Sequence, residues 1–272
     1  MLPAARLKEL LDRLYDSYDF AARTDHDPIG LVHRYSSPAD IEVAGLIAAS
    51  LAYGKVTLFR PVIERILAAM GRSPADYAAS FDVDHERRRF DGIKYRFTKP
   101  DDIVALLSSI QSAIAEYGSL KNLFMAGLSE EDSDAGRAIA FAVGRLRRCE
   151  VPSGGLPHLL PTPASGGAAK RMALYLRWMV RDKDIDFGIW SEIGAHRLVI
   201  PLDTHIARIS GCIGLTTRAA RDWKTAMEIT GALKAFSPND PLRYDFALCH
   251  QGISGLCPAR KEIESCRNCL FF

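Results

Sequence analysis

Residues 37–54 read SPADIEVAGLIAASLAYG and are the strongest single indication of how this chain folds. The segment opens with Ser37 as a helix cap, a first-turn proline and an acidic residue, Asp40, at the third helical position. The following residues, Ile41 to Tyr53, are apolar almost all round a helix. Because a helix without a polar face has to be covered on every side, we expect it to lie at the centre of the molecule.

Helical spacing continues on both sides of this segment. Apolar side chains recur every three to four residues in two long stripes, and capping residues announce further helices downstream. Only residues 90–97 and 197–200 look extended, and neither alternates cleanly between apolar and polar side chains. The predicted fold class is therefore all-α. The further expected helices are 58–70, ended by Gly71; 103–114, opened by Pro100; and two that start after Asp222 and at Asp240-Pro241.

Composition narrows the class of protein. The chain has 272 residues, 48% of them hydrophobic and 25% charged, which is ordinary for a globular protein of one or two domains. The longest uncharged apolar run, residues 43–54, is shorter than the roughly 20 residues needed to span a bilayer. The charged amino terminus has no apolar signal core. We therefore expect a cytoplasmic protein with no membrane partner.

Positive charge is concentrated in two segments. Residues 161–224 carry ten Lys or Arg against six Asp or Glu, and residues 85–99 carry six against two, although the net charge of the whole chain is only +2. A local basic excess suits a surface that faces phosphates, but such clusters are often simply solvated faces.

Two short segments carry groups that could do chemistry. PTPASGGAAK, residues 161–170, places Gly166 and Gly167 directly before a helix, where free backbone N–H groups can bind an anion with Lys170 on the first turn. The simpler interpretation is a glycine-rich helix entry with a surface lysine. IPLDTH, residues 200–205, predicts that Asp203 caps a helix, or is a carboxylate held at its positive end.

Several blocks resemble the helix-hairpin-helix DNA glycosylases. Residues 201–215, with Asp203, His205 and Arg208, are similar to the signature that carries the catalytic aspartate of endonuclease III and the 8-oxoguanine glycosylases. Residues 247–252, ahead of Cys257, look like the corresponding region of cluster-bearing members. The blocks SGGAAKR, YLRWMVR and PLDTH also resemble a bacterial family distantly related to these enzymes.

The resemblance implies a two-lobed all-α HhH-GPD fold. Residues 24–198 would form one lobe with Lys170, and residues 1–23 with 199–272 would form the other, with Asp203 and the late cysteines. The protein would act as a monomer in DNA base-excision repair. It would remove a damaged, oxidised base that is flipped out of double-stranded DNA into the cleft between the lobes.

The same resemblance assigns roles to residues. Asp203 would stabilise positive charge as the sugar–base bond breaks, and Lys170 would attack the sugar and permit strand cleavage as an AP lyase. The residues implied to contact the DNA backbone are Ser165, Gly166, Gly167, Arg171, His205 and Arg208. The aromatic walls of the base pocket could come from Trp178, Phe187 and Trp190, each of which could instead be a core residue.

One departure from the family pattern concerns the hairpin. The Leu-Pro-Gly-x-Gly turn that usually precedes the catalytic lysine is missing, and the SGG sequence at 165–167 has to stand in for it. Lys170 is also further from Asp203 in the sequence than in most members, although the separation resembles that of the archaeal-type 8-oxoguanine glycosylases.

Four of the six cysteines lie between residue 249 and the chain end, and the last two form a Cys-x2-Cys pair. In a cytoplasmic protein this density favours a metal over disulfides. The resemblance implies a 4Fe-4S cluster, with zinc or no metal as the alternatives. The candidate ligands are Cys249, Cys257, Cys266 and Cys269.

Two other function classes stay open. One is a nucleic-acid-binding protein of the same fold without catalysis, which the missing hairpin favours. The other is a metal-dependent phosphohydrolase of the HD type, suggested by His26-Asp27 in an all-helical chain, although that fold needs an earlier histidine and none precedes His26.

Overall fold

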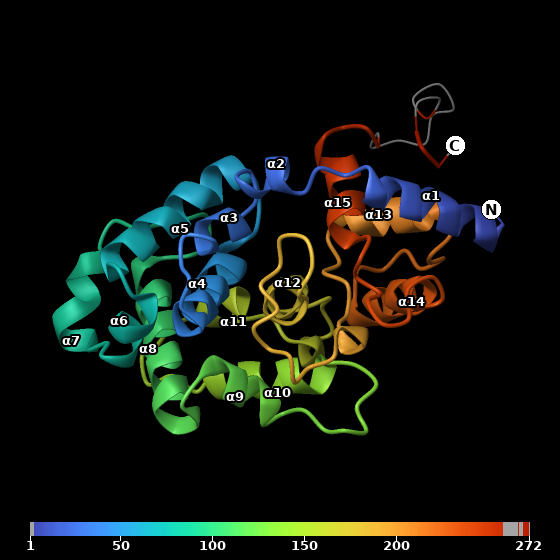
Figure 1. Ribbon diagram of the computed structural model, residues 1–272. Helices are drawn as coiled ribbons and strands as arrows, with labels where there is room; N and C mark the ends of the chain where they lie inside the picture. Colours follow the sequence, from blue (N-terminus) through green and yellow to red (C-terminus); the bar gives the residue numbers. More distant parts are fainter. Residues whose placement is uncertain (1–2, 258–265, 267–268, 272) are drawn as a thin grey trace.

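The structure, a computed structural model, describes residues 3–257, 266 and 269–271. The elements in this part of the chain are helices, and pairing between extended segments is limited there to two isolated bridges, Tyr95 with Thr98 and Gly167 with Asp222 (Figure 1). The all-α prediction is confirmed. The segment 90–97, predicted to look extended, forms a 3-10 turn and then a tight reversal at Tyr95–Thr98.

The α-helices follow one another along the whole described chain. They are α1 Ala4–Asp16, α2 Ala21–Thr24, α3 Ile29–Val32, α4 Pro38–Leu51, α5 Val56–Met70, α6 Pro74–Ala79, α7 Val83–Glu86, α8 Pro100–Tyr117, α9 Leu120–Met125, α10 Gly136–Leu146, α11 Leu156–Leu159, α12 Lys170–Val180, α13 Thr204–Ile213, α14 Trp223–Lys234 and α15 Asp245–Ile253. The 3-10 turns are η1 Arg87–Phe90, η2 Pro163–Ser165 and η3 Ala195–Arg197.

Helix α4 is the central helix that the sequence predicts. Every residue from Ile41 to Leu51 is buried, and the helix contacts α3, α5, α6, α9 and α12. Its start differs in one detail, because the side chain of Ser37 makes no capping hydrogen bond. Asp40 instead accepts hydrogen bonds from Ser73 Oγ at 2.8 Å and Ala75 N at 2.9 Å, so it ties α4 to the start of α6.

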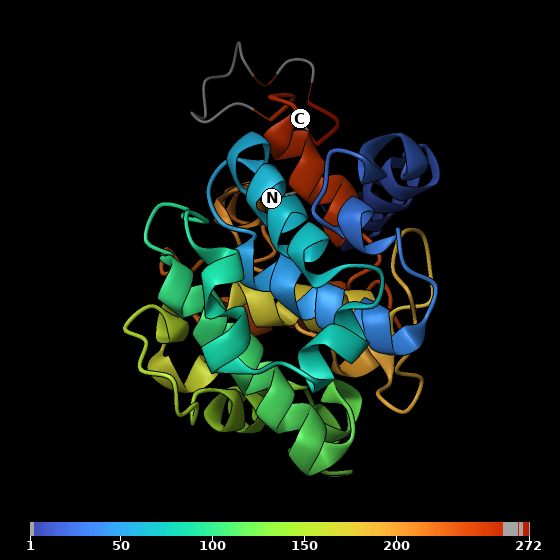
Figure 2. The same cartoon turned by 90° about the vertical axis from the view of Figure 1, so that its left-hand side faces the viewer.

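Helix α12 packs directly against α4. Gly45 allows the close approach, since a Cβ atom at this position would lie 2.9 Å from Met179 Cε and 3.3 Å from Tyr175 Cε2. The Tyr175 hydroxyl donates to the carbonyl oxygen of Glu42, and the Glu42 carboxylate accepts from Trp190 Nε1 at 2.9 Å. Figure 2 shows α4 in blue and α12 in yellow beside one another in the middle of the molecule.

Most predicted helix boundaries agree with the structure. Gly71 ends α5 with φ +81°, Pro100 is the first residue of α8, and Asp222 caps α14 by accepting a hydrogen bond from Thr225 N. The last helix starts later than expected, at Asp245, because residues 241–244 form turns.

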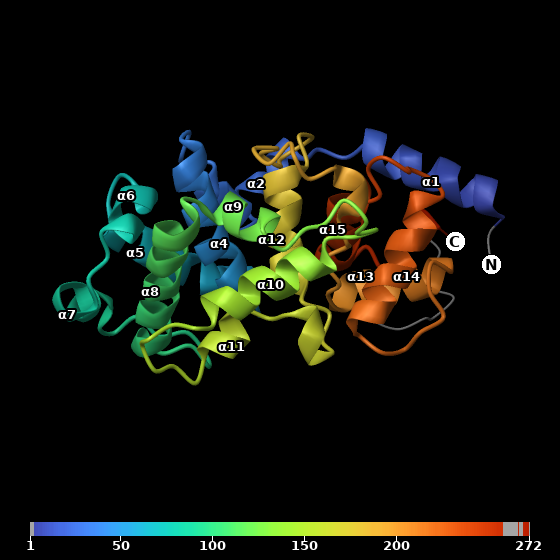
Figure 3. The same cartoon turned by 90° about the horizontal axis from the view of Figure 1, so that it is seen from below.

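The amino-terminal helix lies beside the carboxyl-terminal one, far from it in sequence (Figures 1 and 3). The Tyr244 hydroxyl donates to Asp12 at 2.6 Å, and Tyr18 Oη lies 2.5 Å from His250 Nδ1. A second lobe made of residues 1–23 and 199–272 requires such a contact between its amino-terminal and carboxyl-terminal parts. One continuous hydrophobic core nevertheless extends from Leu7 to Leu248, so the division into two lobes stays a prediction.

No helix in the part of the chain described by the structure is both long and apolar enough to cross a membrane.

The α4–α12 contact makes a stability prediction. Gly45→Leu places a side chain where Met179 and Tyr175 already lie, so we expect the free energy of unfolding to fall by about 1–3 kcal/mol through overpacking. Gly144→Leu is the matched control, because Gly144 is exposed in α10 with open space at its Cβ and gains helix propensity. Chemical denaturation measures both, and equal stabilities of the two variants would contradict the proposed packing.

Candidate functional site

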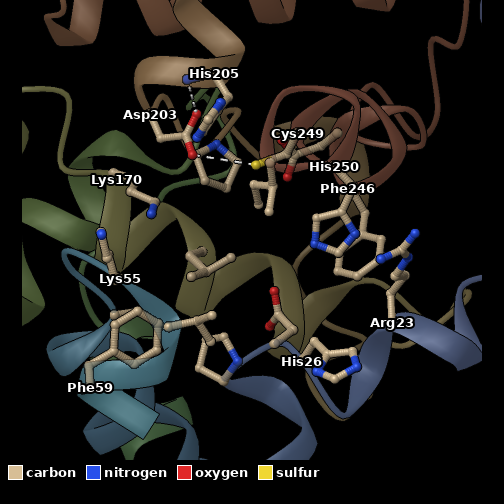
Figure 4. A pocket seen from close by; sticks show the side chains of 18 of the residues that line it. Arg23, His26, Lys55, Phe59, Lys170, Asp203, His205, Phe246, Cys249 and His250 are labelled. Atoms are coloured by element: carbon tan, nitrogen blue, oxygen red, sulfur yellow. Dashed lines mark hydrogen bonds between the residues drawn. The ribbon is translucent and has the colours of Figure 1, made fainter. Parts of the chain in front are cut away.

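A cavity of about 490 Å³ opens between the segment 23–28, the loop from α4 to α5, α12, the start of α13, and α15. This volume lies in the range of small-molecule sites in proteins, roughly 300–1,000 Å³. Figure 4 shows charged and aromatic side chains from all of these elements around one space. The cavity contains both residues that the sequence singled out for catalysis, Lys170 and Asp203.

Asp203 is held by the start of α13. Its Oδ1 accepts hydrogen bonds from the backbone N–H groups of His205 and Ile206, both at 2.8 Å, which is the capping role the sequence predicts. Its Oδ2 accepts a hydrogen bond from Cys249 Sγ on α15 at 3.4 Å (Figure 4). The carboxylate is therefore fixed by two helices and still lines the cavity.

Lys170 is the first residue of α12. Ala169, which precedes it, adopts the left-handed conformation with φ +47°, at a cost of roughly 1–2 kcal/mol for a non-glycine residue. Lys170, Leu174 and Arg177 lie on one face of α12, and all three line the cavity. No described residue forms a salt bridge with Lys170, and its amino group points into the cavity in Figure 4.

A buried ion-pair network forms part of the cavity wall and extends behind it. Arg177 donates to Asp245 Oδ2 at 2.6 Å and to Asp186 Oδ1 at 3.2 Å. Arg181 pairs with Asp186 at 2.6 Å and with Asp240 at 2.9 Å. The network joins α12 to the connection after it and to the start of α15.

The cavity interior has carboxylates whose ionisation is opposed by burial. Burial raises the pKa of Asp245 to about 6, against the favourable charge of Arg177, and Asp203 adds to the rise. Burial also raises the pKa of Asp27, against the backbone hydrogen bond from Ile29 and the charges of Arg177 and Lys170. These carboxylates share the cavity with Lys170 and Arg177, and Phe59 adds an aromatic wall.

Lys55 is a site residue that the sequence analysis missed. It follows Gly54, whose φ of +85° ends the turn between α4 and α5. A Cβ at Gly54 would lie 2.5 Å from the hydroxyl of Tyr95, which donates to Tyr53 O. The loop is thus anchored at the tip of the 95–98 turn, and Lys55 lines the cavity on the same side as Lys170 (Figure 4).

The sequence analysis did not place Arg23, His26 or His250 in the same site as Lys170 and Asp203. These three residues lie far from Lys170 and Asp203 in the sequence. Arg23 and His26 are exposed and line the cavity on the side opposite Lys55 and Lys170 (Figure 4). The only sequence signal was the His26-Asp27 pair, which suggested a different chemistry. Both of its members line this cavity.

Two of the predicted base-pocket aromatics are core residues. Trp178 and Trp190 are fully buried, at 0% exposure, and neither lines the cavity, so the prediction of a base pocket built from them is wrong. Their side chains fill the core around α4 and α12. Phe187 packs against His33, with ring centroids 4.5 Å apart and ring planes tilted by 37°, and also lies outside the cavity lining. The aromatic residues that do line it are Phe59 and Phe246.

Arg171 does not face DNA phosphates. It is buried, and its guanidinium donates to the carbonyl oxygens of Ser50 and His158 and stacks over the Tyr53 ring. Burial lowers its pKa to about 10. Its prediction as a DNA-backbone contact is wrong, because the side chain is buried and both of its terminal nitrogens donate to backbone carbonyl oxygens.

The segment 165–167 is exposed but is not the open anion cradle that the sequence suggested. Gly166 has φ +79° and its N–H donates to Pro163 O, so this donor is not free. Gly167 forms a bridge with Asp222. Ser165 Oγ donates to Thr162 O. None of the three residues lines the cavity.

His205 and Arg208, the other two residues predicted to contact the DNA backbone, lie in different places: only His205 lines the cavity. His205 lines the cavity, and its Nδ1 is buried without a hydrogen-bond partner among the described residues. Arg208 donates to Cys257 O at 2.8 Å, which ties α13 to the segment after α15. Their contact with DNA stays a prediction.

The predicted cysteine ligands lie in two places along the described chain, Cys249 on α15 and the other three after it. Cys249 lies in the cavity wall with its thiol on Asp203, and burial raises its pKa well above the usual value. Burial also raises the pKa of Cys269, and the thiols of Cys257, Cys212 and Cys266 add to this rise. Within the described residues no three Cys, His, Asp or Glu side chains are placed to hold a metal ion. The described geometry therefore fits neither a 4Fe-4S cluster with Cys249 nor a zinc site, and both stay predictions.

The buried position of His250 predicts how the stability of the protein depends on pH. Burial, together with the positive charges of Arg23 and Arg177, lowers the pKa of His250 to about 4. The unfolded chain protonates this histidine near its ordinary pKa of 6.5, so stability should fall as the pH drops from 6.5 towards 4. His250→Gln should make this loss of stability shallower, as followed by thermal unfolding across that range.

The matched control is His85→Gln. His85 is exposed, and its hydrogen bond with Asp82 raises its pKa, so its removal should not make the loss shallower. A direct readout is the NMR titration of the His250 ring in the native protein, and a midpoint near 6.5 would refute the assignment.

Comparison with known proteins gives one family. A family model described as "Protein of unknown function (DUF2400)" matches residues 27–254, a range that includes Asp27, Lys55, Lys170, Asp203 and Cys249. No curated protein and no solved structure matches the chain. Because the match covers most of the sequence, the chain belongs to the DUF2400 family.

Proposed function

We propose that this protein is a nucleic-acid base glycosylase whose reaction takes place in the cavity that Lys170 and Asp203 share. The observation that carries the proposal is the arrangement of these two side chains. They come from the starts of two different helices, α12 and α13, and line the same cavity, which is large enough for a nucleoside. The resemblance to helix-hairpin-helix glycosylases assigns the two catalytic roles to the same pair.

Asp203 suits the stabilisation of a positively charged sugar. Breaking the sugar–base bond leaves positive charge on the sugar, and a carboxylate fixed beside it lowers the barrier without reorganising during the reaction. Two backbone N–H groups and the Cys249 thiol already orient Asp203. The carboxylate is therefore already oriented in the folded protein and needs no further ordering during the reaction.

Lys170 suits attack on the anomeric carbon. Its nitrogen would form the new bond as the base leaves with the sugar–base bonding electrons, and loss of a proton and ring opening would give a Schiff base. The absence of a salt bridge to any described residue leaves its amino group available inside the cavity. Strand cleavage would then follow from the Schiff base.

The chief rival is a nucleic-acid-binding protein without catalysis. The occupied N–H of Gly166 and the missing hairpin favour it, because the usual DNA-anchoring turn is not formed. The metal-dependent phosphohydrolase has less support. His26 and Asp27 line the cavity, but they do not belong to a metal-binding group within the described residues.

Borohydride trapping tests the lysine. The protein is incubated with duplexes that carry 8-oxoguanine, uracil, an oxidised pyrimidine or an abasic site, and reduction should yield a covalent adduct. Lys170→Gln should lose the adduct by at least a hundredfold, since removal of the nucleophile leaves no Schiff base to reduce. Lys183→Gln, which removes an exposed lysine outside the cavity, should retain it.

Asp203→Asn tests the carboxylate in the same assay. It should lower base release by about 10²–10³-fold, the usual effect of removing one electrostatic stabiliser, while thermal unfolding shows a folded protein. Asp182→Asn, an exposed carboxylate outside the cavity, is the control. If no duplex releases a base or forms an adduct, the enzyme proposal fails and the binding protein is favoured.

A further inference from the structure

His250 lies in the wall of the cavity, on the side opposite Lys170 (Figure 4). It belongs to α15, directly after Cys249, and is 9% exposed. Its ring packs against Phe246, with ring centroids 4.1 Å apart and planes tilted by 59°, and against Tyr18, with ring centroids 6.0 Å apart. Neighbours from both ends of the chain therefore hold the ring in place.

A short hydrogen bond occupies one of the two ring nitrogens. Tyr18, in the connection between α1 and α2, has its Oη 2.5 Å from His250 Nδ1. Within the described part of the chain the Tyr18 hydroxyl makes no other hydrogen bond. A tyrosine hydroxyl keeps its proton near pH 7, and burial here raises the pKa of Tyr18 further, to about 12. The acceptor within reach of this O–H group is Nδ1, so Nδ1 carries no proton.

The proton of the ring is then on the other nitrogen. An imidazole whose Nδ1 accepts a hydrogen bond is neutral and carries its one N–H at Nε2. His250 Nε2 makes no hydrogen bond to a described residue, and it is not one of the enclosed polar atoms that lack a partner. Because His250 lines the cavity, this N–H group is a donor that a bound molecule can use.

The departing base is the part of the substrate that needs such a donor. When the sugar–base bond breaks, its electron pair goes to the base, and negative charge builds up on the ring nitrogens and carbonyl oxygens of that base. An N–H group that is already oriented towards one of these atoms stabilises the charge without reorganising. A neutral imidazole can fill this role when its other nitrogen fixes the tautomer.

We propose that His250 is a further catalytic residue, which donates a hydrogen bond from Nε2 to an acceptor atom of the departing base, and that Tyr18 is a positioning residue that holds the Nε2–H tautomer. The inference rests on the proposed function and adds how the base is stabilised. His250 acts on the base, whereas Asp203 and Lys170 act on the sugar. The Nε2 proton stays on His250, and the released base takes its own proton from water.

The tautomer can be measured without a substrate. Two-bond proton–nitrogen correlation spectra of protein with nitrogen-15-labelled histidine distinguish a protonated ring nitrogen from an unprotonated one. We expect His250 to show an unprotonated Nδ1 and a protonated Nε2, and Tyr18→Phe to give a mixture of both tautomers. Tyr35→Phe, outside the cavity lining, is the matched control and should leave the spectrum unchanged. A proton on Nδ1 of the native protein, or the native spectrum in Tyr18→Phe, would overturn the proposal.

Single-turnover base release tests the contact with the base. The substrate is a duplex with 8-oxoguanine, uracil or an oxidised pyrimidine from which the native protein releases the base. His250→Leu should lower the rate by about 10²–10³-fold, the usual effect of removing one fixed donor. His250→Gln keeps an N–H donor and should recover part of this loss. Tyr18→Phe should lose about two- to tenfold, the effect of one missing hydrogen bond.

The control for these rates is His85→Leu, which removes an exposed histidine outside the cavity and should leave base release unchanged. Thermal unfolding of each variant checks that it is folded. Undiminished base release by His250→Leu, in a native protein that is active, would refute the role of His250 and leave the glycosylase standing.

Borohydride trapping on an abasic duplex separates this role from a structural one. An abasic site has already lost its base, so formation of the Schiff base needs Lys170 but no donor for a leaving base. His250→Leu should therefore be trapped as well as the native protein. Loss of the adduct together with base release would overturn the assignment, because the substitution would then disturb the site as a whole. A native protein that neither releases a base nor forms an adduct would refute the proposed function itself.

Discussion

The structure depends on the burial of two arginines at the end of one helix. Arg177 in the last turn of α12 and Arg181 directly after it are almost completely enclosed, and four carboxylates from outside the helix surround them. Buried charges are tolerated only when their partners are held in good geometry, and loss of one partner costs several kcal/mol. The network therefore fixes α12 relative to the connection at 184–186 and the start of α15.

This constraint determines the cavity. Another side of α12 packs against α4 at Gly45. The face of α12 that includes Lys170, Leu174 and Arg177 lines the cavity. Asp245 belongs both to the network and to the cavity lining. The buried carboxylate of Asp245 in the cavity wall is thus a consequence of how α12 is anchored.

The residues misjudged from the sequence share a physical cause. Arg171 and Trp178 lie on α12 with Lys170, but adjacent helical residues point about 100° apart, and both of these residues face the core. Trp190, in the connection after α12, is also fully buried. Large aromatic residues and a paired arginine are compatible with a base pocket or a core, and local sequence does not distinguish them. Lys55 was missed because no neighbouring residue in the sequence points to chemistry, and Arg23 lies near only the His26-Asp27 pair, which suggested a different reaction.

The sequence by itself determined the all-α class, the central position of α4, most helix starts and the capping geometry of Asp203. These follow from apolar periodicity and side-chain-to-backbone hydrogen bonds, which act within a few residues. Only the tertiary structure decided which charged groups share a cavity and that the Cys249 thiol donates a hydrogen bond to Asp203. Those relations join residues tens to hundreds of positions apart, and they are set by how the helices pack rather than by any local pattern.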